Sequence, residues 1–467
     1  MNMKRFFIAM SSLIIAPCAF CEGANGGIAL APESVSLTQN ERREAVITYT
    51  LANTPAIVTM EIQTNTLANG EGEWIDIGGE NVHTVSGDVN KIIRTTNTAK
   101  TIKWKARKDW PERFITNGSV RAVLTAWPTN APPRYLVAGL DTVGDIRFYA
   151  SSNYVPGGIS SDLYKTNSLL MRRIDAAGVE WWMGTSETES IRAADREYYH
   201  QVTLSEDYYI GVYEVTQAQY KKMCDTTVSG NWSRPINPAS SDSFAGYDDS
   251  AFRPVGKMTM IILRGMNAAG TEYSWPQTGH DVSSSSLMGQ LRTKTGNIAE
   301  FDLPTEAQWE YACRAGTKTQ FYNGSASAAN YKKIGWYQGN STEDTTDGVK
   351  QTHPVGMKTP NAWGLYDMAG NVQERCLDRS SSEDTFLATL APDWMRGGVT
   401  VDPKGAEAGT VRDDKIQMII RGGSYAHAIS TSTSPSNDGR SGCRGSGGYS
   451  ADGGYNGFRL ACPAVFR

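Results

Sequence analysis

Apolar and polar residues alternate along three segments in the first third of the chain. They are residues 56–63, 101–107 and 119–127. In the second segment Ile102, Trp104 and Ala106 would face inward, and the basic residues between them would face outward. Because the side chains of a β-strand alternate between two faces, each segment predicts a half-buried strand. The Gly, Asn and Asp turns between them predict an antiparallel β-sandwich of the fibronectin-like kind over residues 29–132.

A linker follows the predicted sandwich. Residues 129–133 read TNAPP, and two adjacent prolines cannot continue a regular helix or strand. The start of the next domain stays open between residues 134 and 170. Within the sandwich His83 stands apart from other residues that bind metals or catalyse reactions, so we expect a spacer or docking domain.

The second part of the chain contains short strand-like runs and two helix starts. The strand-like runs are residues 179–184 and 208–215. Thr216 and Thr305 each precede a run with helical spacing, and Gln308 follows Thr305 in the capping-box pattern. In that second helix Glu306 and Glu310 are expected to be surface residues that interact with the helix dipole, rather than catalytic acids.

Residues 353–374 combine many Gly, Asn and Asp residues with large apolar side chains. Glycine permits left-handed backbone and the apolar side chains need burial, so this segment predicts an ordered, irregular loop that packs inward. Asp367 and Glu374 would supply carboxylates to one point, and Gly370 and Val372 would supply carbonyl oxygens. Such a set of oxygens suits Ca²⁺. The alternative is that both carboxylates only cap turns.

Five motifs follow one another in this second part. They are YEVTQAQY at 213–220, LPTEAQWEYACRAGT at 303–317, HPVG with GLYDMAGNV within 353–372, RGGSY at 421–425 and GFRLA at 457–461. Together they resemble the formylglycine-generating enzyme family, the sulfatase-modifying factor domain. The resemblance implies a loop-rich domain, related to the C-type lectin domain, over residues 165–467. The whole chain is therefore expected to be of the α+β class.

Active members of this family are similar in having two cysteines a few residues after RGGS. These bind copper(I) and pass electrons to oxygen while a sulfatase cysteine becomes formylglycine, and soft thiolates suit copper(I). Here the corresponding positions fall at about His427 and Ser432, and neither is cysteine. A single imidazole is a poor copper(I) site, so copper is not expected. The family's WEW also becomes Gln373-Glu374-Arg375, which removes an aromatic side chain from the pocket lining.

The resemblance also implies two structural calcium sites. The inner site corresponds to Asp367, Gly370, Val372 and Glu374. The second site corresponds to Asn330 with Tyr331, and to Asp347 with Val349. Bound calcium would hold the loops in place and would stabilise the fold by mass action.

Five cysteines remain beyond the N-terminal segment. They are Cys224, Cys313, Cys376, Cys443 and Cys462. In an oxidising compartment this odd count means two disulfides and a spare thiol, or fewer bridges, and the lack of a CxxC pair argues against a zinc site. The resemblance implies a disulfide between Cys313 and Cys443 and leaves the pairing of the other three open.

The N-terminus has the layout of a secretory signal. Lys4 and Arg5 precede an apolar run and then small residues, which predicts a signal peptide over residues 1–21. No later stretch is long and apolar enough to predict a transmembrane segment, so we expect an exported protein that is periplasmic, on the cell surface or extracellular. Removal of the segment moves the formal net charge from −4 to −6, because two bases and no acid are lost. This net negative charge does not indicate a basic surface of the kind that binds nucleic acid, so no nucleic-acid partner is expected.

These observations favour an exported, calcium-stabilised binding module that does not oxidise its ligand. The loop after RGGSY, residues 426–439, would form part of a groove for a peptide or a glycan together with Ser424 and His427. An oxidase that acts on a sulfatase is the alternative activity, and the missing cysteine pair separates the two. A structural surface protein whose two domains act as spacer and cap is the remaining alternative.

Overall fold

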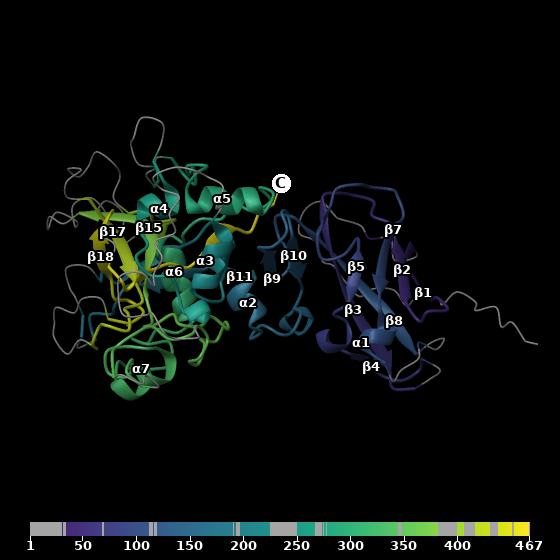
Figure 1. Ribbon diagram of the computed structural model, residues 1–467, viewed down its shortest axis with the longest axis horizontal. Coiled ribbons are helices and arrows are strands. Elements are labelled where there is room, and N and C mark those ends of the chain that lie inside the picture. Colours follow the sequence, from purple (N-terminus) through teal and green to yellow (C-terminus); the bar gives the residue numbers. More distant parts are fainter. Residues whose placement is uncertain are drawn as a thin grey trace, which may run out of the picture. The chain divides into compact units, whose positions relative to one another are not determined.

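The computed structural model describes most of the chain in two compact units. Its described residues are 30, 34–67, 70–111, 115, 119–189, 191–192, 197–224, 250–266, 273, 275–276, 278–343, 348–381, 399–405, 416–429, 438–450 and 453–466. The first unit holds the described residues up to Tyr135 together with Arg147–Ser160; the second holds Leu136–Ile146 and Ser161–Phe466 (Figure 1). The predicted signal peptide lies outside the described residues.

Antiparallel β-sheets build the first unit. One sheet has the order β1-β2-β7-β5, with strands β1 (Ser36–Gln39), β2 (Ala45–Tyr49), β5 (Val85–Gly87) and β7 (Lys100–Trp104). The other has the order β4-β3-β6 with β8 paired along β3, with strands β3 (Ala56–Asn65), β4 (Trp74–Asp76), β6 (Ile92–Ile93) and β8 (Val120–Pro128). Ile47 and Trp104 of the first sheet, and Val58 and Leu124 of the second, are buried and supply core side chains.

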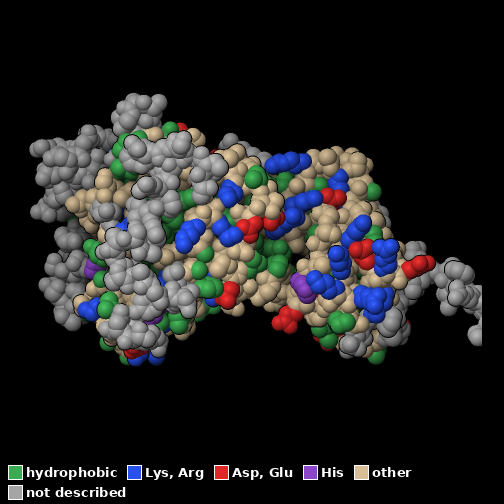
Figure 2. Space-filling view, in the orientation of Figure 1, with side chains coloured by type: hydrophobic (Ala, Val, Ile, Leu, Met, Phe, Trp, Pro, Cys, Tyr) green, Lys and Arg blue, Asp and Glu red, His purple; other side chains and the backbone are tan. Residues whose placement is uncertain are grey.

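The three strands predicted by alternation are present as β3, β7 and β8, but the second is shorter than predicted. It ends at Trp104, and α1 (Ala106–Asp109) follows at once. The carboxylate of Asp109 explains the turn, because it accepts hydrogen bonds from the Trp104 indole (3.1 Å) and from the backbone nitrogen of Thr84 (2.6 Å). Lysine and arginine side chains gather on the visible face of this unit (Figure 2), in line with the exposed Lys103.

Short elements complete the first unit near the place where the chain passes between units. They are η2 (Gly79–Asn81), β10 (Ile146–Tyr149) and η3 (Ser152–Tyr154). Tyr154 fixes the returning segment in this unit, because its hydroxyl bonds to the carboxylate of Asp76 and accepts a hydrogen bond from the backbone nitrogen of Ile62 (3.1 Å).

The second unit combines sheet strands with short helices. One set of paired strands runs β9-β11-β14-β20, with strands β9 (Tyr135–Gly139), β11 (Ser168–Ile174), β14 (Tyr208–Gly211) and β20 (Ala461–Pro463). In it, β14 is antiparallel to both β11 and β20. A second runs β12-β13-β16, with strands β12 (Glu180–Met183), β13 (His200–Thr203) and β16 (Thr400–Val401). A third runs β18-β17-β15-β19, with strands β15 (Gln373–Ser381), β17 (Ile416–Arg421), β18 (Gly445–Gly448) and β19 (Asn456–Gly457).

The helices of this unit are short. They are α2 (Leu163–Thr166), α3 (Gln217–Met223), η4 (Ser250–Phe252), α4 (Met260–Arg264), α5 (Leu287–Lys294), α6 (Glu306–Arg314) and α7 (Ala328–Ile334). A side chain caps the N-terminus of α3, α4, α5, α6 and α7. Thr216 and Thr305 cap α3 and α6 as predicted, and each forms a complete capping box. Helix α6 packs against β15 and β17 (Figure 1). In the described ranges, no helix has the length and apolar character needed to cross a membrane.

Candidate functional site

Helix α6 brings two carboxylates into the interior of the second unit. The side chain of Gln308 accepts a hydrogen bond from the backbone nitrogen of Thr305 (2.9 Å) and so fixes the start of the helix. Glu306 and Glu310 follow one turn apart, and only 4% and 1% of these residues is exposed. The prediction that they are surface residues is therefore wrong. Their burial is tolerated because arginines compensate the two charges.

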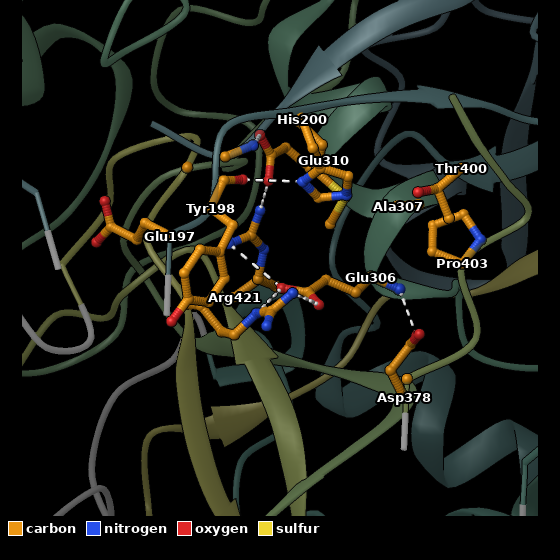
Figure 3. A pocket seen from close by; sticks show the side chains of 15 residues that line it. Glu197, Tyr198, His200, Glu306, Ala307, Glu310, Asp378, Thr400, Pro403 and Arg421 are labelled. Carbon is orange, nitrogen blue, oxygen red and sulfur yellow. Dashed lines mark hydrogen bonds and ion pairs between the residues drawn. The ribbon is translucent and has the colours of Figure 1, made fainter. Parts of the chain in front are cut away.

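Three arginines make this compensation. Arg421 of β17 pairs with Glu310 and lies 3.6 Å from Glu306, whereas Arg314 pairs with the second oxygen of Glu310 at 2.7 Å. Arg444 binds Glu306 through two nitrogens, at 2.6 and 2.5 Å. Figure 3 shows both glutamates next to Arg421. Burial acts to raise the pKa of Glu310, but the charges of Arg314 and Arg421 outweigh it and lower the pKa.

A small pocket of about 50 Å³ opens beside this network (Figure 3). Asp378 of β15 lines it and accepts a hydrogen bond from the backbone nitrogen of Glu306 (2.6 Å). Burial, with the charge of Glu306 adding to it, raises the pKa of Asp378 to about 7, and burial lowers the pKa of His200 on the opposite wall. Asp378 therefore titrates near neutral pH, whereas the lowered pKa of His200 keeps its ring neutral there. The space suits a few water molecules rather than a peptide or a sugar ring.

Residues 353–372 form an ordered, inward-packed loop, as predicted, and residues 373–374 already belong to β15. Asp367, Gly370 and Asn371 have φ angles of 54°, 83° and 57°, in the left-handed region. At Gly370 a side chain has no room, because a Cβ would lie 2.3 Å from the carbonyl oxygen of Trp336. The glycine is thus required both for its backbone conformation and for this close approach.

Three buried carboxylates interact at the inner side of this loop, and one guanidinium faces them. Glu374 pairs with Arg459 (2.8 Å) and also accepts a hydrogen bond from the Trp309 indole (2.7 Å). Glu214 accepts hydrogen bonds from the amide of Asn371 (2.7 Å) and from the backbone nitrogen of Val372 (3.0 Å). Burial, together with the charges of Asp367 and Glu374, raises the pKa of Glu214 well above its usual value.

Among these three carboxylates, Asp367 has an oxygen atom without a hydrogen-bond partner. One of its oxygens accepts a hydrogen bond from the backbone nitrogen of Gly356 (2.7 Å), and the other, Oδ1, is buried without a hydrogen-bond partner. Burial raises the pKa of Asp367 to about 6. An orphaned buried oxygen and an excess of carboxylates over guanidinium fit a bound cation at Asp367. The negative charge of Glu374, by contrast, is already compensated by Arg459.

The second predicted calcium site lies only partly within the described residues. The side-chain amide of Asn330 donates to the carbonyl oxygen of Ser325 (3.0 Å), and Tyr331 is buried with its ring stacked on Tyr337 (centroids 4.4 Å apart). Val349 is 45% exposed. Asp347 lies outside the described residues, so the second calcium site stays a prediction.

The predicted groove residues Ser424 and His427 lie together in a turn. The Ser424 hydroxyl and Nδ1 of His427 are 2.6 Å apart, and the His427 ring meets the ring of Tyr455 edge-on with centroids 5.1 Å apart. The carbonyl oxygen of His427 accepts from the backbone nitrogen of Gln338 (3.0 Å). Burial lowers the pKa of His427, so the ring is neutral near pH 7. Ser432, the other position of interest, lies outside the described residues.

The predicted disulfide between Cys313 and Cys443 is not formed. All five cysteines beyond residue 21 are free thiols, and both members of this pair are buried. The sulfur of Cys313 instead lies 3.6 Å from the carbonyl oxygen of Met368 and 3.7 Å from the hydroxyl of Ser441. Burial raises its pKa to about 11, so the thiol stays protonated.

The sequence analysis missed Glu214, Arg459, Asp378 and His200. Glu214 and Arg459 had a detectable signal, because each is a single charge between apolar residues, in VYEV and GFRLA. Such a charge needs a buried partner, although the sequence does not say which one. Among the described residues, no three or more His, Cys, Asp or Glu side chains are grouped to hold a metal ion. The inner calcium set has two carboxylates, so it stays a prediction.

Comparisons with known proteins agree with this architecture. The profile of the sulfatase-modifying factor enzyme 1-like domain matches residues 176–464. The chaperone protein LppX of Paenibacillus barcinonensis is 32% identical over 247 residues, which cover 47% of this chain and 81% of LppX. The formylglycine-generating enzyme of Thermomonospora curvata is 36% identical over 127 residues, which cover 26% of this chain and 38% of that enzyme. The chain thus spans less than half of the enzyme's length.

A solved structure is also similar. The Treponema denticola variable protein 1 matches 63% of this chain and 95% of its own length, with 25% sequence identity and a TM-score of 0.40.

Proposed function

Because this chain belongs to the sulfatase-modifying factor enzyme 1-like family, we propose that its second unit binds a peptide or a glycan without oxidising it. The binding surface is the turn of Ser424 and His427 with the neighbouring Tyr455, called the His427 surface below. Tyr455 is 36% exposed, so it offers a partly open aromatic face for a ligand.

The chemistry at His427 carries this proposal. The resemblance places a copper-binding thiolate at about this position, and the chain supplies an imidazole whose Nδ1 is already bonded to Ser424. Burial keeps the Cys313 thiol protonated, and the other described thiols are buried likewise or lie in elements other than this turn. The described thiols therefore do not replace the missing pair of copper-binding cysteines. Without soft sulfur ligands at the turn, electron transfer from a substrate thiol to oxygen lacks its metal site.

The relative LppX supports a peptide as the ligand. Its name describes a chaperone protein, and chaperones hold polypeptide segments. The match to LppX covers 47% of this chain and 81% of LppX. The match to the formylglycine-generating enzyme covers 26% of this chain and 38% of that enzyme. The more extensive of these two matches is thus to the relative named a chaperone, and this supports the proposed binding role.

A peptide array tests this proposal. The labelled full chain is expected to bind a subset of peptides, and Tyr455→Ala is expected to weaken that binding about tenfold, because an aromatic contact at the centre of a site contributes strongly. Val465→Ala is the matched control, since Val465 is 45% exposed in the same unit and follows β20 rather than belonging to the turn. Equal binding by Tyr455→Ala and the native chain would refute the His427 surface as the peptide site.

Calcium is the cofactor that we propose for the loop 353–374. Asp367 would hold the ion with the carbonyl oxygens of Gly370 and Val372. Glu374, whose oxygens also accept hydrogen bonds from Arg459 and Trp309, would complete the set that the resemblance implies. The orphaned Oδ1 of Asp367 supports this assignment. When bound, calcium neutralises buried negative charge and stabilises the loop.

The remaining proposals concern the whole protein. We propose that the chain is exported by its first 21 residues, and that the first unit is a β-sandwich spacer or docking domain. We further propose that the second unit has the C-type-lectin-like fold and that the protein does not act on nucleic acid. The layout of the N-terminus, the paired sheets of the first unit and the acidic net charge support these statements.

A further inference from the structure

The outer face of a three-stranded sheet in the second unit carries a distinct set of side chains. In the antiparallel register of β12 and β13, Trp182 lies opposite Gln201 and Glu180 lies opposite Thr203. Because side chains alternate along strands, these four share one face. His200, next to Gln201, lines the pocket of Figure 3 and so faces the opposite side.

Trp182 is stacked on one side and open on the other. Its ring lies 4.5 Å from the ring of Tyr199, centroid to centroid, with 14° between the planes, and 37% of Trp182 is exposed. On the neighbouring strand β16, Val401 pairs with Thr203 and is 60% exposed. Exposed apolar side chains that gather on one sheet face indicate a surface that contacts a ligand.

The polar side chains on this face define what that ligand is. Gln201 and Thr203 are half-buried and Glu180 is exposed, so an amide, a hydroxyl and a carboxylate surround the indole. These groups donate to and accept from hydroxyl groups. Of the four strand residues only Glu180 is charged, so they offer no cation to an anionic ligand. An apolar ring face combined with such polar groups suits an uncharged sugar ring.

We propose that this face, formed by Glu180, Trp182, Tyr199, Gln201 and Thr203 and called the Trp182 face, binds a neutral oligosaccharide. A sugar ring stacks on the open side of the Trp182 indole, while Gln201 and Glu180 bond to its hydroxyl groups. The Trp182 face shares no residue with the His427 surface and is independent of the peptide proposal.

Calorimetric titration of the full chain tests this assignment. The probes are cellohexaose, laminarihexaose, mannohexaose and chitohexaose, with an oligogalacturonate as the anionic control. At least one neutral probe is expected to bind, and the oligogalacturonate is not. Trp182→Ala is expected to raise the Kd of that probe by about tenfold or more, and Trp182→Phe by less, because a smaller ring remains. Circular dichroism verifies that both variants fold.

Two results would overturn the proposal. One is that none of the four neutral probes binds; the other is that Trp182→Ala binds as tightly as the native chain. Tyr455→Ala separates the two surfaces, since it should leave the oligosaccharide Kd unchanged while it weakens peptide binding. If Tyr455→Ala abolished oligosaccharide binding and Trp182→Ala did not, the glycan would belong to the His427 surface and the Trp182 face would have no ligand.

Discussion

At the scale of single residues, buried charges with partners from distant segments hold the second unit together. Arg440 pairs with Glu197, 243 positions away, at 2.8 Å. Arg459 pairs with Glu374 across 85 positions. Such pairs cost desolvation free energy, but removing one partner costs more because the other charge stays buried and alone. The interior of this unit is therefore sensitive to changes of single charged residues.

Glu310→Gln tests this sensitivity. The change leaves Arg421 and Arg314 without their carboxylate, so it is expected to lower the free energy of unfolding by about 3–5 kcal/mol. Urea unfolding followed by tryptophan fluorescence measures the loss. Glu343→Gln is the control, because Glu343 pairs with Lys332 on the surface, and it should cost much less. Equal costs for the two variants would contradict a stabilising role of the buried network.

Asp378→Asn tests the pH dependence of the same region. The folded pKa of about 7 lies above the unfolded value of about 3.9. The protonated carboxyl thus contributes stability that is fully present below about pH 4 and is lost as the pH rises to about 7. Relative to the native chain, Asp378→Asn should therefore gain stability over this range and keep the gain above it. Urea unfolding from about pH 5 to about pH 8 measures the difference, and a constant difference would refute the raised pKa.

At the scale of elements, local sequence patterns predicted those strands and helix starts that are determined by residues close to one another in the chain. The alternation in 56–63 predicted β3, and Thr305 with Gln308 predicted the start of α6, because both signals lie within a few residues. The loop 353–374 was also predicted from its glycines and apolar residues. Strand β7 was predicted too long, because Asp109, five positions beyond Trp104, decides where it ends.

Partners that lie far apart in the sequence were not predictable in this way. Glu306 and Glu310 have the spacing of an exposed helix face, and only the folded chain brings Arg421 and Arg444 to them. The same applies to Cys313, whose sulfur contacts Met368 and Ser441 rather than another thiol. One sequence reveals that a buried charge needs a partner, but tertiary packing selects that partner.

The calcium proposal belongs to the loop as an element. Calcium at about 100 times its Kd would add about 2.7 kcal/mol to the stability, so EDTA is expected to lower the Tm of the native chain. Asp367→Asn should remove this calcium effect, because Oδ1 of Asp367 is the orphaned oxygen. Differential scanning calorimetry with calcium and with EDTA measures it.

The control for this experiment is Asp162→Asn, whose side chain is 74% exposed. It should respond to calcium as the native chain does. A native Tm that is the same in calcium and in EDTA would count against the calcium site.

At the scale of the whole molecule, the chain belongs to the family but has no cysteine at the position where the resemblance places a copper-binding thiolate. The second unit contains the family motifs over residues 176–464, and their residues make structural contacts, as Glu214, Glu374 and Arg459 do. The position expected for a copper-binding thiolate instead holds His427, bonded to Ser424. We therefore propose a family scaffold that serves for binding, with a second surface at Trp182 for a sugar.

The most direct test combines anaerobic copper(I) titration of the purified chain with aerobic mass spectrometry of a peptide that carries a sulfatase cysteine motif. An active formylglycine-generating enzyme serves as the positive control. We expect that the chain binds no copper(I) tightly and that the peptide cysteine keeps its mass. Tight binding of one copper ion, together with conversion of the cysteine to the aldehyde, would contradict it and would establish the oxidase.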